Sequence, residues 1–134
     1  MSQRNVEIVR TQYASFQTLG TGGDVRSHFL RFFASDAEYR PVEEIDAICG
    51  HDALVRYTER WLDAWESYRD QVDEIIDGGE LVVGAVTVHG RGSGSGLPIA
   101  QTMFHVFEIH DAKIAQLREY LDRGQALEAA GRRE

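Results

Sequence analysis

The chain has 134 residues, of which 43% are hydrophobic and 27% charged, a balance that suits one compact domain, residues 1–134, with little room for a second. Acidic residues outnumber basic ones by 22 to 14, for a formal net charge of −8, which makes nucleic acid and anionic membrane surfaces poor partners. Cys49 is the only cysteine, so an internal disulfide is excluded and a reducing, cytoplasmic setting is expected.

Helical periodicity dominates the first half of the chain. Apolar side chains recur at three- and four-residue steps over residues 5–19 and again over residues 25–33, and glycines separate the two stripes. A short extended piece over residues 38–42 follows. After Gly50 a third helix is predicted from Leu54, Tyr57, Thr58, Trp61, Trp65 and Tyr68, which lie at helical spacing.

The second half changes to a period of two, which is typical of strands. Four strands are predicted, over residues 68–76, 80–89, 99–109 and 113–122, and short connections between them favour an antiparallel, curled sheet. Residues 123–130 favour a short closing helix, and residues 131–134 are expected to fray. The predicted fold class is therefore α+β, with three N-terminal helices packed on one face of the sheet.

One titratable pair stands out on the last two predicted strands. Alternation places Gln101, Met103, His105, Phe107 and Ile109 on one face, and Ala115, Leu117, Glu119 and Leu121 on one face of the next strand. Because Glu119 is flanked by leucines, it is expected to face the interior, where burial would raise its pKa. A core histidine with satisfied polar atoms and a structural glutamate are the competing interpretation.

The connection between these strands decides whether the pair shares a face. A three-residue loop over 110–112 would place His105 opposite Leu117 and diagonal to Glu119. A two-residue turn would place the two side chains on opposite faces of the sheet.

Several motifs are absent. The glycine- and serine-rich run over residues 90–96 lacks the spacing of a phosphate-binding loop, and it joins two strands. The five histidines have no metal-ligand spacing, and no serine-nucleophile motif occurs. The sequence thus predicts no cofactor and no metal. The longest apolar strand is too short to span a bilayer, and the N-terminus has no apolar signal core.

The chain resembles the nuclear transport factor 2-like superfamily and, within it, the SnoaL-like proteins. The resemblance lies in residues 32–41 (FFASDAEYRP), 50–54 (GHDAL) and 106–122 (VFEIHDAKIAQLREYLD). It implies a cone-shaped, cystatin-like fold and a homodimer formed through the outer sheet face, where Arg118, Tyr120 and Asp122 lie.

The resemblance also implies functional residues. In SnoaL-like cyclases the catalytic acid is an aspartate on the closing strand with a histidine on the preceding strand, and Glu119 and His105 fall at the similar places. The partner groups of the related limonene epoxide hydrolase would fall near residues 85–88, where they are missing. The ketosteroid isomerase shares a tyrosine similar to Tyr13, but its two acids would fall at Arg40 and Met103. Both of those chemistries are therefore disfavoured.

Two functions follow. The first is an acid/base enzyme, cyclase or isomerase-like, acting on a small apolar carbonyl compound with Glu119 and His105 as catalytic residues. The second is a binding or dimerisation module without turnover. In either case the residues expected to contact the small molecule are Tyr13, Tyr39, Trp61, Trp65, Met103, Leu117 and Leu121. Each aromatic among them has plain core packing as its competing interpretation.

Overall fold

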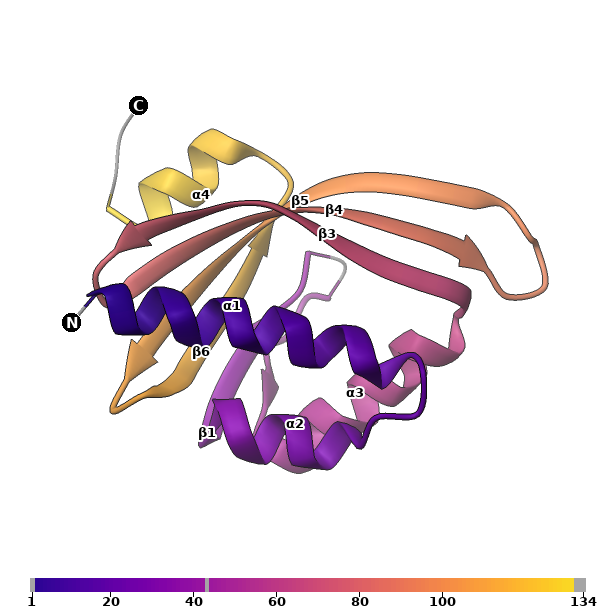
Figure 1. Ribbon diagram of the computed structural model, residues 1–134, viewed down its shortest axis with the longest axis horizontal. Helices are drawn as coiled ribbons and strands as arrows, with labels where there is room; N and C mark the ends of the chain where they lie inside the picture. Colours follow the sequence, from indigo (N-terminus) through magenta and orange to yellow (C-terminus); the bar gives the residue numbers. More distant parts are fainter. Residues whose placement is uncertain (1, 43, 132–134) are drawn as a thin grey trace.

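The computed structural model describes residues 2–42 and 44–131, which form an α+β fold (Figure 1). In chain order the elements are α1 (Ser2–Leu19), α2 (Val25–Phe32), β1 (Phe33–Arg40), β2 (Ile48–Cys49), α3 (His51–Asp63), β3 (Trp65–Gly78), β4 (Leu81–Gly92), β5 (Pro98–His110), β6 (Lys113–Tyr120) and α4 (Arg123–Ala129). The strands form a six-stranded sheet in the order β2-β1-β6-β5-β4-β3. The meander from β3 to β6 is antiparallel, as predicted, whereas β1 pairs with β6 in parallel.

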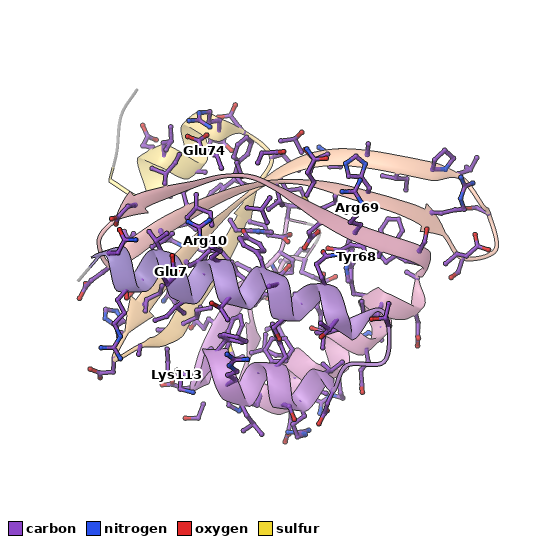
Figure 2. The ribbon with its side chains drawn as sticks, viewed as in Figure 1. Glu7, Arg10, Tyr68, Arg69, Glu74 and Lys113 are labelled. Atoms are coloured by element: carbon purple, nitrogen blue, oxygen red, sulfur yellow. The ribbon has the colours of Figure 1, made fainter. Side chains whose placement is uncertain are left out.

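The helices form where the apolar stripes predicted them, and α2 shows why a short helix is stable here. The Asp24 carboxylate caps its first turn by accepting from the Arg26 N–H at 3.1 Å. At the other end, the Lys113 ammonium donates to the carbonyls of Leu30 and Arg31 at 2.9 and 2.7 Å (Figure 2). A cation at a helix C-terminus satisfies free carbonyls and opposes the helix dipole.

The third helix is shorter than predicted. It ends at Asp63, so Trp65 and Tyr68 belong to β3 and not to the helix. Trp65 lies four residues after Trp61, and Tyr68 lies three residues after Trp65. This spacing imitates a helical stripe, but aromatic residues also favour strands. Gly90 of β4, which pairs with Tyr68, leaves room for the Trp65 indole on the sheet, because a side chain at Gly90 would overlap the Trp65 ring. This space, which sequence spacing does not reveal, favours the strand.

Two other boundaries differ from the prediction. The strand β1 begins at Phe33, directly after α2, and ends at Arg40, before Pro41, where an extended piece over residues 38–42 was expected. The two-residue strand β2 was not predicted, and it is held by pairing with Glu38 and Tyr39 of β1. The predicted fraying at the C-terminus falls largely on residues 132–134, outside the described residues.

The sheet curves around the helices. Register shifts occur within the pairings of β3 with β4, of β5 with β6 and of β1 with β6, and such bulges bend strands and increase their twist. Figure 1 shows α1, α2 and α3 on one side of the curved sheet and α4 on the other. The larger buried cluster lies on the side of α1 to α3, and a smaller one, including Phe104, Val106 and Leu127, lies beneath α4. No helix within the described residues is long and apolar enough to cross a membrane.

The connection between β5 and β6 differs from the three-residue loop that was expected. Only Asp111 and Ala112 form the turn, both with positive φ (51° and 64°), and His110 pairs with Lys113. Such a turn alone would place the side chains of His105 and Glu119 on opposite faces of the sheet. However, one extra residue in β6, Ala115, shifts the register between the pairs Ile109–Ile114 and Glu108–Gln116, so that His105 lies directly opposite Glu119.

This turn gives a stability prediction. Ala112→Gly should raise the free energy of unfolding by about 0.5–1 kcal/mol, because left-handed backbone is costly for alanine and nearly free for glycine. The matched control is Ala100→Gly in the exposed part of β5, which should lower it by about 0.5–1 kcal/mol. Urea unfolding of the three proteins measures both values, and destabilisation by Ala112→Gly would contradict the assigned turn.

Candidate functional site

A cavity lies between the helices and the curved sheet. The space open to the centre of a water molecule is about 70 Å³, enough for a few waters or a small organic group. Its walls are mainly apolar and aromatic, and all the long elements contribute to them. The lining residues include Gln12, Tyr13, Phe16, His28, Tyr39, Tyr57, Trp61, Tyr68, Asp70, Met103, His105, Phe107, Leu117 and Glu119.

The structure brings most of the predicted residues to this cavity. Tyr13, Tyr39, Trp61, Met103, His105, Leu117 and Glu119 all line it. Trp65 does not: its ring packs over Gly90 and against Trp61, with ring centroids 5.4 Å apart. Leu121 does not either, because β6 ends at Tyr120 and Leu121 is 55% exposed. Glu119 is therefore flanked by one inward-facing leucine, Leu117, and not by two.

A chain of hydrogen bonds joins four of these side chains. The Tyr13 hydroxyl lies 2.8 Å from Nδ1 of His105, and Nε2 of His105 lies 3.2 Å from Oε2 of Glu119. The same oxygen accepts from the Tyr39 hydroxyl at 2.6 Å, while Oε1 accepts from the backbone N–H of Val42 at 3.2 Å. His105 and Glu119 keep only 11% and 9% of their side-chain exposure. These hydrogen-bonded side chains thus form a buried polar network within the otherwise apolar wall of the cavity.

The chemistry of the groups assigns the protons. A carboxylate only accepts hydrogen bonds, so Nε2 of His105 carries a hydrogen, and this N–H donates a hydrogen bond to Glu119. Nδ1 then accepts from the Tyr13 hydroxyl where the imidazole is neutral and donates to it where the imidazole is protonated. Burial raises the pKa of Tyr13 well above its usual range, and the charges of Asp70 and Glu119 add to this effect, so Tyr13 keeps its proton.

The pKa of Glu119 differs from the prediction. Burial, the largest single effect, would raise it, as was expected. The hydrogen bond and charge of His105, together with the hydrogen bonds from Tyr39 and Val42, outweigh burial and lower the pKa below its usual value. Sequence patterning locates the carboxylate on an inward face but does not identify three donors that converge on it. Glu119 is therefore held as a carboxylate.

The close approach of α1 to the sheet makes the hydrogen bond between Tyr13 and His105 possible. Gly84 on β4 pairs with His105, and a side chain there would overlap the Tyr13 hydroxyl. The missing side chain leaves room for the phenol beside the strand, where its hydroxyl reaches Nδ1 of the neighbouring imidazole.

Sequence reasoning missed a second buried acid, Asp70 on β3. Its Oδ1 accepts from the Tyr68 hydroxyl at 2.7 Å, and it lines the same cavity. Burial raises the pKa of Asp70, and Glu119 adds to the rise, while the Tyr68 hydrogen bond and His105 oppose it without cancelling it. The signal that could have found it is the alternation of Tyr68 and Asp70 around exposed Arg69. That alternation begins the strand predicted over residues 68–76, but the acid on its inward face was not singled out.

His28 on α2 is a second residue that the sequence did not single out. Its Nδ1 lies 2.9 Å from the Ser15 hydroxyl, its Nε2 has no hydrogen-bond partner within the part of the chain that the structure describes, and phenylalanines surround the ring. Burial, helped by the charge of Arg31, lowers the pKa of His28 to about 4. His28 is therefore neutral near pH 7 and contributes no charge to the cavity. No group of three or more metal-ligating side chains occurs among residues 2–42 and 44–131.

Comparison with known proteins identifies what this chain is similar to. A family model described as a SnoaL-like domain matches residues 9–117. Searching curated protein sequences gives no match. Among solved structures, a protein assigned as a SnoaL-like polyketide cyclase from Jannaschia sp. CCS1 is similar at 16% identity, with a TM-score of 0.80 over 90% of this chain and 86% of that one.

Two further structures are enzymes or ligand complexes by their descriptions. TerC, co-crystallised with polyporic acid, is 19% identical, with a TM-score of 0.75 over 96% of this chain and 98% of that one. SalBIII, an epoxide hydrolase/cyclase-like enzyme of pyran ring formation in salinomycin, is 20% identical, with a TM-score of 0.74 over 92% and 95%. At these identities the likeness shows the fold alone.

The approach of α1 to the sheet can be tested by substitution. Gly84→Ala should push the Tyr13 hydroxyl away from His105 and lower the free energy of unfolding by about 1–3 kcal/mol, the usual cost of overpacking a core. Gly20→Ala is the matched control, because a side chain at Gly20 meets open space, and it should be close to neutral. Thermal unfolding compares the variants, and equal stability would argue against the close contact.

Proposed function

The chain belongs to the SnoaL-like domain family, and we propose that it is a small-molecule acid/base enzyme, cyclase or isomerase-like, that acts on an apolar carbonyl compound. The observation that carries the proposal is the buried chain of Tyr13, His105, Glu119 and Tyr39 along one wall of an otherwise apolar cavity. A positioned base accelerates proton transfer, and hydrogen-bond donors in a water-excluded site stabilise the negative charge that develops during it.

In this proposal Glu119 is the base. Its lowered pKa keeps it ionised at neutral pH, ready to take a proton from the carbon next to the carbonyl group. The electron pair of the broken C–H bond then moves toward the carbonyl oxygen, giving an enolate. Once protonated, Glu119 accepts hydrogen bonds more weakly, which frees the Nε2–H of His105 and the hydroxyl of Tyr39 to donate to that oxygen.

The apolar walls support the choice of substrate. Phe107, Leu117 and Met103 flank the polar chain, and Trp61 and Tyr57 face it from α3. Such walls favour a small, largely hydrocarbon molecule with a single polar end. The likeness to an assigned polyketide cyclase and to an epoxide hydrolase/cyclase-like enzyme agrees with chemistry of this kind.

A binding module without turnover is the second candidate. The observation that favours it is that both ring nitrogens of His105 and both oxygens of Glu119 already have partners within the protein. A network satisfied in this way can serve only to hold the fold together while the cavity carries an apolar ligand.

The proposal extends to the assembly. We place one cone-shaped SnoaL-like domain, residues 1–134, in a cytoplasmic homodimer formed through the outer face of the sheet. Part of the surface that the sequence analysis predicted for the dimer already makes contacts within the same chain, because Tyr120 packs beneath α4 and the Asp122 carboxylate caps that helix. We therefore assign the contact to the outer side of β3 to β5 beyond α4, around Arg69 (Figures 1 and 2). A single-chain mass by light scattering would remove the dimer from the proposal.

The enzyme and the binding module differ in one substitution. The Glu119→Gln variant should still bind cyclohexanone, because the shape of the side chain is kept. It should catalyse the exchange of the α-protons of cyclohexanone with heavy water about 10²–10⁴-fold more slowly than the wild type, because the base is lost. Proton NMR of the ketone measures exchange, and a thermal shift measures binding.

The control is Glu66→Gln, which makes the same change at an exposed position of β3 and should leave exchange unaltered. If the wild-type protein binds the ketone without accelerating exchange, the binding module is the better description. If Glu119→Gln exchanges as fast as the wild type, Glu119 is not the base.

A further inference from the structure

We infer that His28 on α2 is a ligand-binding residue, which holds a hydroxyl group of the molecule in the cavity through its Nε2 atom. The inference rests on the proposed function, which makes this cavity the substrate site, and deepens it by naming the substrate class. The observation beneath it is a buried imidazole nitrogen that has no hydrogen-bond partner among the described residues, in a ring that lines the cavity.

His28 is enclosed by aromatic side chains and is only 3% exposed. Its hydrogen-bond partner is the Ser15 hydroxyl of α1, 2.9 Å from Nδ1. The imidazole also lies against four phenylalanine rings, at centroid distances of 5.1 to 6.1 Å, and these are Phe16, Phe29, Phe32 and Phe33. Packing and one hydrogen bond therefore hold the ring in a fixed position, as a binding residue requires.

Packing alone does not explain a histidine at this position. A neutral imidazole has one nitrogen that donates and one that accepts, and Ser15 can satisfy Nδ1 in either role. Burying the other nitrogen without a partner costs free energy, whereas a phenylalanine would fill the space among its neighbours without that cost. The cavity, which the His28 ring also lines, is the space from which a partner for Nε2 can come.

Two further neutral polar side chains line the cavity from the helices. Gln12 of α1 and Thr58 of α3 are both buried, and neither side chain forms a hydrogen bond with another residue in the described ranges. Together with His28 they give one uncharged polar group from each of the three helices. The two carboxylates of the cavity, Asp70 and Glu119, lie on strands. A bound molecule can therefore form hydrogen bonds on the helix side as well as on the sheet side.

The groups on the helix side suit a hydroxyl group. Burial, helped by the charge of Arg31, lowers the pKa of His28 to about 4, so the ring is neutral near pH 7. A charged group would lose its hydration there without an opposite charge in contact, and an anion would also be repelled by Asp70 and Glu119. A hydroxyl group both donates and accepts, so it pairs with either tautomer of His28.

A hydroxyl group held by His28 would also fix which way round the molecule lies. The free space is about 70 Å³, so a small ring compound contacts the helices and the strands at once. With the hydroxyl group at α2, a carbonyl group on the far side of the ring is directed to His105 and Glu119 on β5 and β6. Such positioning restricts the molecule to orientations in which proton transfer can occur. Neutral cyclic hydroxyketones are therefore the predicted substrate class.

The experiment compares the binding of 4-hydroxycyclohexanone and 4-methylcyclohexanone by titration calorimetry. Burial of apolar surface alone would favour the methyl compound. The wild type should nevertheless bind the hydroxy compound about 10-fold more tightly, because only a hydroxyl group satisfies Nε2 of His28. His28→Phe, which keeps an aromatic ring, should lose this preference. His110→Phe, the same change at an exposed position of β5, should keep it.

A measurement on the wild-type protein accompanies it. In protein labelled with ¹⁵N at its histidine rings, saturation with 4-hydroxycyclohexanone should shift the Nε2 resonance of His28, and 4-methylcyclohexanone should shift it much less. His51 is the internal reference, because its Nε2 already lies 3.0 Å from the carbonyl oxygen of Phe33, and its resonance should stay in place. If the Nε2 resonance of His28 does not respond to the bound hydroxy compound, the inference is overturned, even if His28→Phe does not fold.

The outcomes separate the two proposals. Equal or weaker binding of the hydroxy compound by the wild type overturns the role of His28, and proton exchange of cyclohexanone that depends on Glu119 would still support the proposed function. A preference for the hydroxy compound that His28→Phe retains also overturns the role of His28. A preference that His28→Phe loses, without any proton exchange by the wild type, supports the hydroxyl site and overturns the enzyme in favour of the binding module. Binding of none of these ketones overturns both proposals.

Discussion

The register between β5 and β6 is the constraint on which the rest of the site depends. A two-residue turn closes the hairpin, and one extra residue in β6 returns Glu119 to the face of His105. Without that residue, Glu119 would point to the side of the sheet that α4 covers, and Tyr39 and Val42 would lose their shared acceptor. A bulge of a single residue thus decides which face of the sheet carries the chemistry.

Burying acids in a small core has to be offset by hydrogen bonds. Glu119 receives donors from three different segments, so β1, the residues that follow it and β5 are all tied to β6 through one carboxylate. The carboxylate of Asp70 accepts fewer hydrogen bonds, and this difference shifts the pKa values of the two acids in opposite directions. The same contacts therefore hold the sheet to its neighbours and set the proton affinities of the cavity.

Periodicity predicted most of the architecture, because apolar spacing reflects burial directly. It placed α1, α2 and the meander from β3 to β6, and it placed His105 and Glu119 on inward faces. It extended the third helix through Trp65 to Tyr68, where the strand was also predicted to begin, since residues three and four apart also occur where a helix leads directly into a strand. It also failed to identify Asp70 and the lowered pKa of Glu119, because both depend on contacts with residues far away in the chain. Long-range partners of this kind leave no local pattern.

The cavity is walled by residues that also form the core. Tyr13, Phe107 and Leu54 belong to the main buried cluster and at the same time limit the free space. Widening the hollow for a bulkier guest would remove atoms that hold the domain together, at a cost that grows with the volume vacated. Adaptation of this scaffold to larger molecules would then require stabilising substitutions elsewhere in the domain, so the size of the ligands that it binds and its free energy of unfolding evolve together.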